Sequence, residues 1–240
     1  MTRNILEAGT LKKYDEYGYT ELPYEIGQLT AEDLDAVAKV LQFATQTNQA
    51  QFLARPPVQI QQILAQNCSF GLFCENDLIG IRLSGYPTLE TLYLLDNLPI
   101  SFEDSQRHAR LTGLVILPPY RKQKFGSYLT KINLEHLANQ GRDIVWMLIS
   151  PFNYPSLKLF LKLDFKIYKL VKLSHNRERF LLKFETSIEP LAMTEIKLAH
   201  FQNIALQTEL IESGWVGYAV TENPLDFNVM YGRGMLCDRN

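Results

Sequence analysis

The sequence predicts a mixed α/β fold, and two observations support this prediction. Runs of strand and helix character follow one another in the order strand, two helices, hairpin, strand, helix, strand, helix and two strands, which is typical of mixed α/β proteins. The chain has 240 residues, 46% of them hydrophobic, so it can bury a substantial core without covalent cross-links. We expect one domain over residues 1–190 and an extension over 191–240 that packs on the same domain.

The first elements are predicted from capping and periodicity. Thr30 precedes Ala31-Glu32-Asp33, which gives a hydroxyl N-cap and an acidic first turn. Apolar residues then recur at helical spacing between Leu34 and Leu41. The elements expected up to residue 85 are a short strand at 22–28, a helix from 31, a second helix after Pro57, and a hairpin formed by the runs 68–74 and 78–85.

The later elements are delimited by proline and glycine. Pro87 and Pro99 break an apolar connection at 86–104, and Gly141 stops a helix. The elements expected are a strand at 111–117, a helix from Phe125 to about Asn139, a buried strand at 144–150, a short helix within 155–163, strands at 165–172 and 178–184, a helix from about Thr194 to Ser213, and strands at 215–220 and 227–231. We expect no repeat of fixed period.

Composition excludes several classes of protein. A formal net charge of -2 excludes a strongly basic nucleic-acid coat protein and an acidic disordered tail. No run reaches the roughly 18 uncharged apolar residues that a membrane helix needs, and the N-terminus has no signal-peptide core. We therefore expect a cytoplasmic protein without a membrane partner. Cys68, Cys74 and Cys237 cannot pair completely and have no metal-ligand spacing, which fits a reducing compartment and no metal site.

The small net charge hides a division along the chain. Residues 1–104 have a charge balance of -8, residues 105–190 one of +9, and residues 191–240 one of -3. No acidic residue occurs from Ser105 to Leu134. A basic middle inside a nearly neutral protein indicates a local anionic ligand rather than a polyanion wrapped around the surface. The acidic flanks indicate an acceptor substrate that is itself cationic.

The segment 114–129 (LVILPPYRKQKFGSYL) predicts the site of that anion. A buried strand ends at a proline pair, a basic loop follows, and Gly126 lies where a helix begins. The first turn of a helix has unpaired N–H groups and the positive end of a dipole, and glycine lets a phosphate approach the backbone. The ordinary alternative is a strand-turn-helix unit whose lysines are solvated.

A second segment, 150–165 (SPFNYPSLKLFLKLDF), makes the pattern more specific, because Asn153 follows a buried strand and a short helix leads to Asp164-Phe165. Together the segments resemble the acyl-CoA-binding core of the GNAT N-acyltransferase superfamily. In that family a strand ending in V-x-P-x-x-R precedes a loop of pattern R/Q-x-x-G-x-G/A and a helix, and an Asn block with a final G-F follows. The element order is similar over about 24–185, and the specific matching is confined to about 114–165.

The resemblance implies a central mixed, mainly antiparallel sheet flanked by helices. It also implies acetyl-CoA or another acyl-CoA as co-substrate, with no permanently bound cofactor. The pantetheine arm would pair with backbone groups of the strand, and the pyrophosphate would lie on the amides of the loop. The residues implied for coenzyme A are Ile116, Leu117, Arg121, Lys122, Gln123, Lys124, Phe125, Gly126, Ser127, Asn153 and Ser156.

Several positions depart from the family pattern, the mildest being Asp164 in place of the glycine before Phe165. Lys124 stands where the first loop glycine is usual, and Phe160 stands where many members have a tyrosine that protonates the leaving thiolate. The strand that often carries a glutamate has Thr112-Gly113 instead. The candidates for general base and acid are therefore His108, whose pKa lies near neutrality, and Tyr154. The alternatives are a solvated loop histidine and a packing aromatic.

The resemblance implies transfer of an acetyl or longer acyl group from acyl-CoA to a primary amine of a small molecule, peptide or protein. One rival is a module that binds acyl-CoA without turnover. A nucleic-acid binder is disfavoured, because the basic run lacks interleaved aromatic residues. The apolar residues at 86–98 can form a wall for the acyl chain or the acceptor, pack over the sheet, or form a dimer surface. The oligomeric state is left open.

Overall fold

The chain divides into two compact units, residues 1–142 and 143–240. The computed structural model describes residues 4–47, 55–87, 104–173, 177–186 and 193–234. The described part of the expected extension belongs to the second unit, and the domain limits 1–190 and 191–240 stay a prediction. Most of the apolar connection at 86–104 lies outside the described residues. None of the described helices is long and apolar enough to cross a membrane.

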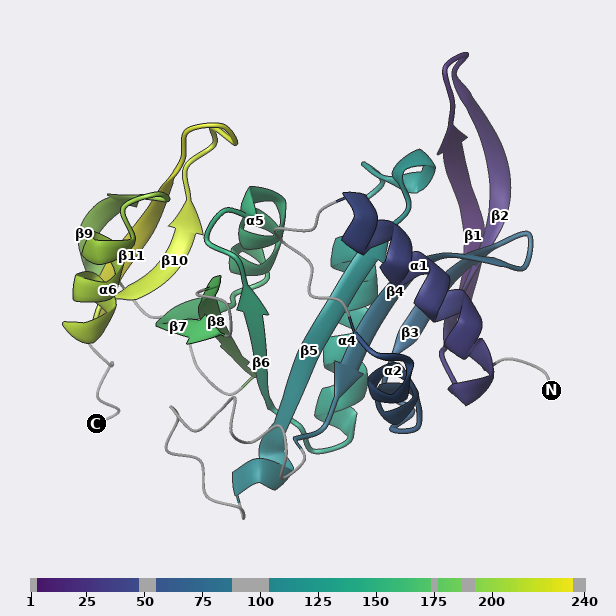
Figure 1. Ribbon diagram of the computed structural model, residues 1–240, viewed down its shortest axis with the longest axis horizontal. Helices are drawn as coiled ribbons and strands as arrows, with labels where there is room; N and C mark the ends of the chain where they lie inside the picture. The colour runs from purple at the N-terminus through teal and green to yellow at the C-terminus, as the bar shows by residue number, and fades with distance from the viewer. Residues whose placement is uncertain (1–3, 48–54, 88–103, 174–176, 187–192, 235–240) are drawn as a thin grey trace. The chain divides into compact units, whose positions relative to one another are not determined.

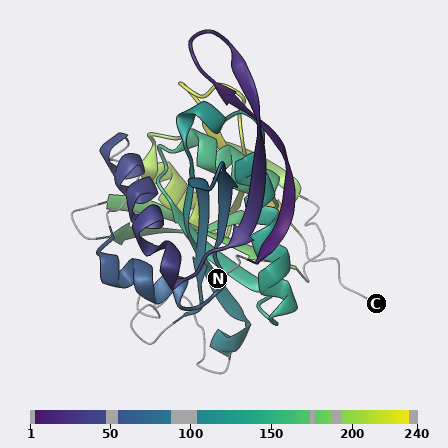
Figure 2. The same cartoon turned by 90° about the vertical axis from the view of Figure 1, so that its right-hand side faces the viewer.

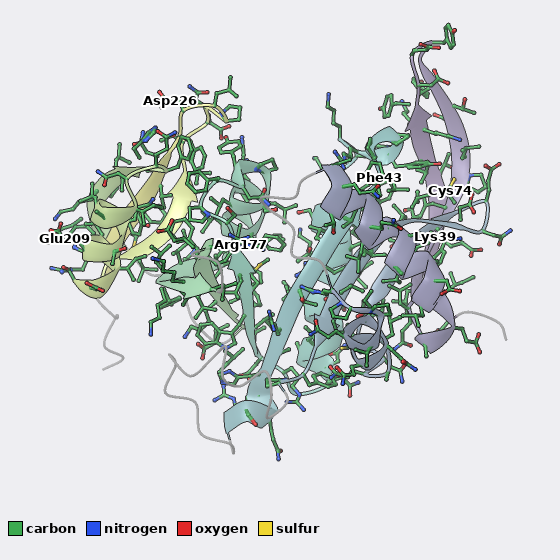
Figure 3. The ribbon with its side chains drawn as sticks, viewed as in Figure 1. Lys39, Phe43, Cys74, Arg177, Glu209 and Asp226 are labelled. Carbon is green, nitrogen blue, oxygen red and sulfur yellow. The ribbon has the colours of Figure 1, made fainter. Side chains whose placement is uncertain are left out.

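The first unit is built on an antiparallel sheet with the strand order β1-β2-β3-β4-β5 (Figure 1). Its strands are β1 (Ile5–Tyr14), β2 (Tyr19–Gln28), β3 (Phe70–Cys74), β4 (Asp77–Gly85) and β5 (His108–Ile116). The turn of the β1–β2 hairpin lies beyond the ends of β3 and β4 (Figure 2). β1 was not expected, because Leu11 is its one fully buried residue and the strand therefore has no clear alternation.

Helices cover both faces of this sheet. The helices α1 (Leu34–Thr47) and α2 (Pro57–Leu64) pack on the face that carries Phe73, Ile81 and Val115. The helix α4 (Phe125–Asn139) packs on the opposite face with Leu11, Phe70 and Leu72. The predicted start of the first helix is confirmed as a 3-10 turn over Ala31–Asp33 that leads into α1, with Thr30 in a reciprocal capping box with Asp33.

The second unit has the strand order β6-β8-β7-β10-β11-β9 and two helices. Its elements are β6 (Ile144–Ile149), α5 (Tyr154–Lys162), β7 (Lys166–Leu173), β8 (Arg177–Glu185), β9 (Met193–His200), α6 (Ile204–Glu212), β10 (Val216–Val220) and β11 (Asn228–Gly234). Each helix packs against a strand from the other half of the unit, α5 on β10 and α6 on β7. The two halves therefore share one core.

The second unit contains two copies of a βαββ motif, so the expectation of no repeat is wrong. Residues 144–184 and 194–234 correspond at a constant shift of 50 through the first strand, the helix and the second strand. Asn153 and Asn203 are both helix N-caps with side chains that accept a hydrogen bond three residues on. The register shifts between Ile167 and Lys169 in β7, and between Gly217 and Ala219 in β10. The pair Ile167–Gly217 joins the copies and marks a pseudo-twofold axis.

The helix expected from Thr194 to Ser213 is wrong in its first half. Residues 193–200 form β9, and α6 begins only at Ile204, after the N-cap Asn203. The run TEIKLAH contains Ala, Leu, Lys and Glu, which favour helices in isolation. Its pairing with β11 over the length of the strand overrides this local preference.

Candidate functional site

At the end of β5, the backbone polar groups of Ile116 and Leu117 point in opposite directions. The N–H of Leu117 donates to the carbonyl oxygen of Ile79 at 2.9 Å, while Ile116 lies opposite Gly80. Because hydrogen-bonded and non-hydrogen-bonded pairs alternate in an antiparallel ladder, the backbone polar groups of Ile116 point away from β4. The Nε of Arg121 donates to the Ile116 carbonyl at 2.8 Å. Of the two strand residues predicted to pair with a pantetheine arm, Ile116 has the suitable orientation.

The loop after β5 has an unusual backbone. A 3-10 turn over Pro118–Tyr120 leads into it. Lys122 and Lys124 both have φ of 65°, in the left-handed region that favours glycine. This conformation explains why a glycine is usual at the position of Lys124. Lys124 keeps the same backbone geometry and adds a positive charge. Arg121, Lys122 and Lys124 are exposed, so their charges are available to an anion.

The side chain of Gln123 holds this loop to the first strand. Its Oε1 accepts from the Lys12 N–H at 2.7 Å, and its Nε2 donates to the Lys12 carbonyl at 2.6 Å. Gln123 was predicted to contact coenzyme A, but its side-chain amide is engaged by Lys12. A contact with a phosphate would therefore come from its backbone.

The N-terminus of α4 has no side-chain cap and no acidic residue in its first turn. The first intrahelical bond of the helix runs from the Tyr128 N–H to the Lys124 carbonyl at 3.0 Å. The N–H groups of Phe125, Gly126 and Ser127 therefore point out of the helix end without an intrahelical acceptor. These amides, the helix dipole and the neighbouring cations can together hold a phosphate.

The second predicted segment forms the start of α5 in the second unit. The Asn153 Oδ1 accepts a hydrogen bond from the Ser156 N–H at 3.2 Å, so these two predicted residues contact each other. In the other copy, Asn203 caps α6 in the same way, through the Leu206 N–H at 3.1 Å. Because the same cap occurs in both copies, helix capping alone is enough to account for an asparagine at this position.

The two candidate catalytic residues are both buried. His108 begins β5 and is 5% exposed, which contradicts the alternative of a solvated loop histidine. Tyr154 donates from its hydroxyl to the Thr221 carbonyl at 3.1 Å, and its ring contacts Phe227, which supports the packing alternative. Their roles as general base and acid stay predictions.

Two arginines that the sequence did not single out lie beside the strand position where the family often has a glutamate. The Nη2 of Arg55 donates to the Thr112 carbonyl at 2.8 Å, and the Nη1 of Arg82 approaches the Gly113 carbonyl at 3.4 Å. Burial lowers the pKa of Arg55 to about 10 and that of Arg82 to about 9. For Arg82 the sequence offered one signal, a basic residue inside the apolar run LIGIRLSG.

Phe160, in the place of the family's tyrosine, is fully buried and packs edge-on against Phe165 with ring centroids 5.4 Å apart. Within the described ranges, no three His, Cys, Asp or Glu side chains gather in a way that would hold a metal ion. The fold, the basic loop after β5 and the uncapped start of α4 define a mixed α/β protein with a helix end suited to an anion.

Comparisons with known proteins agree with this class. The family model for the acetyltransferase (GNAT) family matches residues 38–165, which is more than half of the chain. The chain therefore belongs to the acetyltransferase (GNAT) family. No curated protein matches it in sequence.

Several solved structures have the same fold at low sequence identity. Ard1 from Thermoplasma volcanium aligns with a TM-score of 0.55 at 12% identity, over 69% of this chain and 99% of that one. The diaminobutyrate acetyltransferase EctA from Paenibacillus lautus, in complex with its substrate and coenzyme A, gives 0.52 at 12% identity, over 70% and 99%. The ribosomal-protein-S18-alanine N-acetyltransferase from Escherichia coli gives 0.51 at 14% identity, over 72% and 99%.

Proposed function

We propose that the chain is an acyl-CoA-dependent N-acyltransferase that transfers an acetyl group, or a longer acyl group, to a primary amine. The observation that carries this proposal is the uncapped start of α4 behind a loop with three exposed cations. In a member of the acetyltransferase family, a helix end of this kind is suited to the pyrophosphate of coenzyme A.

The proposed reaction is a direct transfer. The amine nitrogen attacks the thioester carbonyl carbon, the carbon–sulfur bond breaks, and the thiolate leaves and is protonated. The amides of Phe125, Gly126 and Ser127 hold the pyrophosphate, and the outward orientation of Ile116 suits it to pair with the pantetheine arm. Holding donor and acceptor together supplies a large share of the acceleration. A backbone N–H near the thioester oxygen would stabilise the charge that develops there.

The attacking amine must be neutral. The strand has no glutamate to act as base, and Arg55 and Arg82 lie beside the carbonyls of Thr112 and Gly113. Nearby positive charge lowers the pKa of an ammonium group, so an amine bound at this strand would lose its proton more readily. Water or His108 would then accept the proton, with Tyr154 as the candidate acid.

The structural neighbours support two classes of acceptor amine. EctA is complexed with L-2,4-diaminobutyric acid, and the enzyme from Escherichia coli is named for an alanine of ribosomal protein S18. Both a small-molecule amine and a peptide or protein amine are therefore compatible with this fold. We propose both as acceptor classes.

Calorimetric titration with coenzyme A tests the donor site. Gly126→Val would place a branched side chain in the first turn of α4 and should weaken binding about tenfold or more by obstructing the phosphate. Asn139→Val, at an exposed position at the other end of the same helix, is the matched control and should bind normally. Unchanged affinity in a folded Gly126→Val variant would contradict the placement of the pyrophosphate.

A binding module without turnover is the second candidate. The burial of Phe160 where many family members have a tyrosine, and the absence of a carboxylate at 112–113, favour it. Thiol release from acetyl-CoA distinguishes the two candidates, since an enzyme should release thiol faster when an acceptor amine is added. Tight binding of coenzyme A with no release across a broad panel of amines and acyl donors would support the module.

A further inference from the structure

The terminal strand β9 differs from its counterpart β6 in what it exposes. Within the part of the chain that the structure describes, β9 pairs with β11 alone. At the shift of 50 residues, Ile196 corresponds to Trp146. Trp146 is 6% exposed, whereas Ile196 is 58% exposed and Leu198, two residues further on, is 52% exposed. The same motif therefore has a buried first strand in one copy and an apolar, accessible first strand in the other.

The two exposed aliphatic side chains lie on one face of the sheet. Residues two apart on a strand share a face, so Ile196 and Leu198 lie together, and Glu195, Lys197 and Ala199 lie on the other. Helix α6 covers that other face, because Tyr231, which lies opposite Lys197, is buried and donates to the Gln207 Oε1 at 3.0 Å. An accessible apolar pair on a terminal strand is a usual site for pairing with another chain.

The charges of β9 make the strand complementary to itself. In an antiparallel pair about a twofold axis through Ile196, each Glu195 lies opposite the Lys197 of the other chain, and Ile196 lies opposite its own copy. Both charged side chains are exposed. Lys197 also lies over the ring of Trp215 at 4.6 Å, on the helix-covered face, where a carboxylate of a second strand can reach it.

The alternative registers lack this complementarity. An axis through Lys197 places the two lysines opposite each other, and an axis through Glu195 places the two glutamates opposite each other. Like charges directly opposite are unfavourable, and opposite charges are favourable. An axis through Ile196 also keeps both apolar faces on the same side of a continuous sheet.

We propose that two copies of the chain associate through β9, in an antiparallel pair centred on Ile196. The association is isologous, with the same surface on both copies. It is independent of acyl transfer, since it uses no residue of the loop or of the α4 helix end.

Sedimentation velocity over a concentration series, from nanomolar to high micromolar, tests the proposal on the full chain. The wild-type protein should form a dimer as concentration rises. Lys197→Glu should weaken the dimer about tenfold or more, because both cross-strand ion pairs become repulsive. The double variant Glu195→Lys/Lys197→Glu should restore it, since the pairs re-form with their charges exchanged. Circular dichroism and thermal melting establish that each variant is folded.

Cysteine cross-linking tests the register. Ile196→Cys brings two thiols directly opposite each other, at a Cα separation compatible with a disulfide, so mild oxidation should yield a covalent dimer. Leu198→Cys is the matched control and should cross-link poorly, because its opposite residue is number 194. Wild-type protein gives the background from Cys68, Cys74 and Cys237. A wild-type monomer throughout the series would overturn the proposal, as would a double variant that fails to restore the dimer or stronger cross-linking at 198 than at 196.

Discussion

Gln123 and Lys12 are joined by a reciprocal pair of hydrogen bonds, at 2.7 and 2.6 Å, although 111 positions separate them in the chain. The side-chain amide of Gln123 acts as an added strand residue on β1. Gln123 lies between Lys122 and Lys124, both with φ of 65°. A left-handed conformation costs a non-glycine residue roughly 1–2 kcal/mol, and such strain persists where the surroundings enforce it. The first strand therefore helps to fix the shape of the proposed phosphate loop.

Removal of the Gln123 amide should release this loop. We expect Gln123→Ala to weaken coenzyme A binding about tenfold, because the left-handed backbone at Lys124 is then less enforced. Lys124→Gly in the same background should recover much of the affinity, since glycine adopts this conformation at little steric cost. In acyl-transfer assays the KM for acyl-CoA should rise while kcat changes little. Isothermal titration calorimetry and steady-state kinetics measure these effects.

The matched control for this pair of variants is Gln140→Ala, an exposed glutamine at the far end of α4. It should leave the affinity unchanged. Equal affinities for wild type and Gln123→Ala would show that the loop keeps its shape without β1.

The raised pKa of Tyr231 gives a pH-dependent test of the second unit. Tyr231 is buried, and burial raises the pKa of its phenol well above the ordinary value near 10. The unfolded chain therefore loses this proton first. The stability that Tyr231 contributes is fully present below about pH 10 and is lost as the pH rises further.

Tyr231→Phe isolates this contribution. The variant should be about 1 kcal/mol less stable near neutral pH, because the Gln207 Oε1 loses its donor. The difference from wild type should shrink as the pH rises above about 10. Urea unfolding at matched pH values measures it, and a constant difference across the alkaline range would contradict the role of the phenol.

Local patterns in the sequence were sufficient to predict the elements whose ends are marked by a glycine or by a short polar turn. The helix predicted from Phe125 to about Asn139 is confirmed at those residues, because helical periodicity and Gly141, with φ of 74°, delimit it. The hairpin of β3 and β4 is confirmed for a similar reason, since polar residues at 75–77 separate two apolar runs.

Long-range relationships were not predictable in the same way. No local pattern links Gln123 to Lys12, and β1 has too little buried surface to show alternation. The repeat was missed because few identities survive between its copies. Asn153 and Asn203 are identical, but Phe165 corresponds to Trp215 and Asp164 to Gly214. Both copies have a helix N-cap, a left-handed residue after the helix and a buried aromatic residue that follows it. More than one residue type can occupy each of these positions, so the two sequences have diverged.

The left-handed position after each helix tests this interpretation. Asp164 has φ of 65°, and its counterpart Gly214 has φ of 82°. Gly214→Asp should therefore be tolerated, at a cost of about 1 kcal/mol or less, because aspartate accepts this conformation more readily than most residues. Gly214→Val should cost clearly more, about 2 kcal/mol, since branching at Cβ disfavours positive φ. Nothing lies within 4 Å of an added Cβ at Gly214, so packing does not confuse the comparison. Chemical denaturation measures both costs, and equal costs would argue against a backbone origin.

The pair on the pseudo-twofold axis gives the strongest test of the duplication. A Cβ on Gly217 would lie 2.9 Å from the Cβ of Ile167, closer than real Cβ atoms approach. Gly217→Ile should therefore destabilise the unit by about 3 kcal/mol or more through overpacking. Ile167→Gly alone should also cost about 3 kcal/mol or more, because Ile167 is fully buried. Because the two positions are equivalent in the repeat, Ile167→Gly together with Gly217→Ile transfers the side chain across the axis into the same space. We expect the exchange to be less damaging than the sum of the single changes by about 2 kcal/mol, within the range for residues in contact. Urea unfolding of the four proteins measures this coupling, and additive costs would show that the positions are not interchangeable.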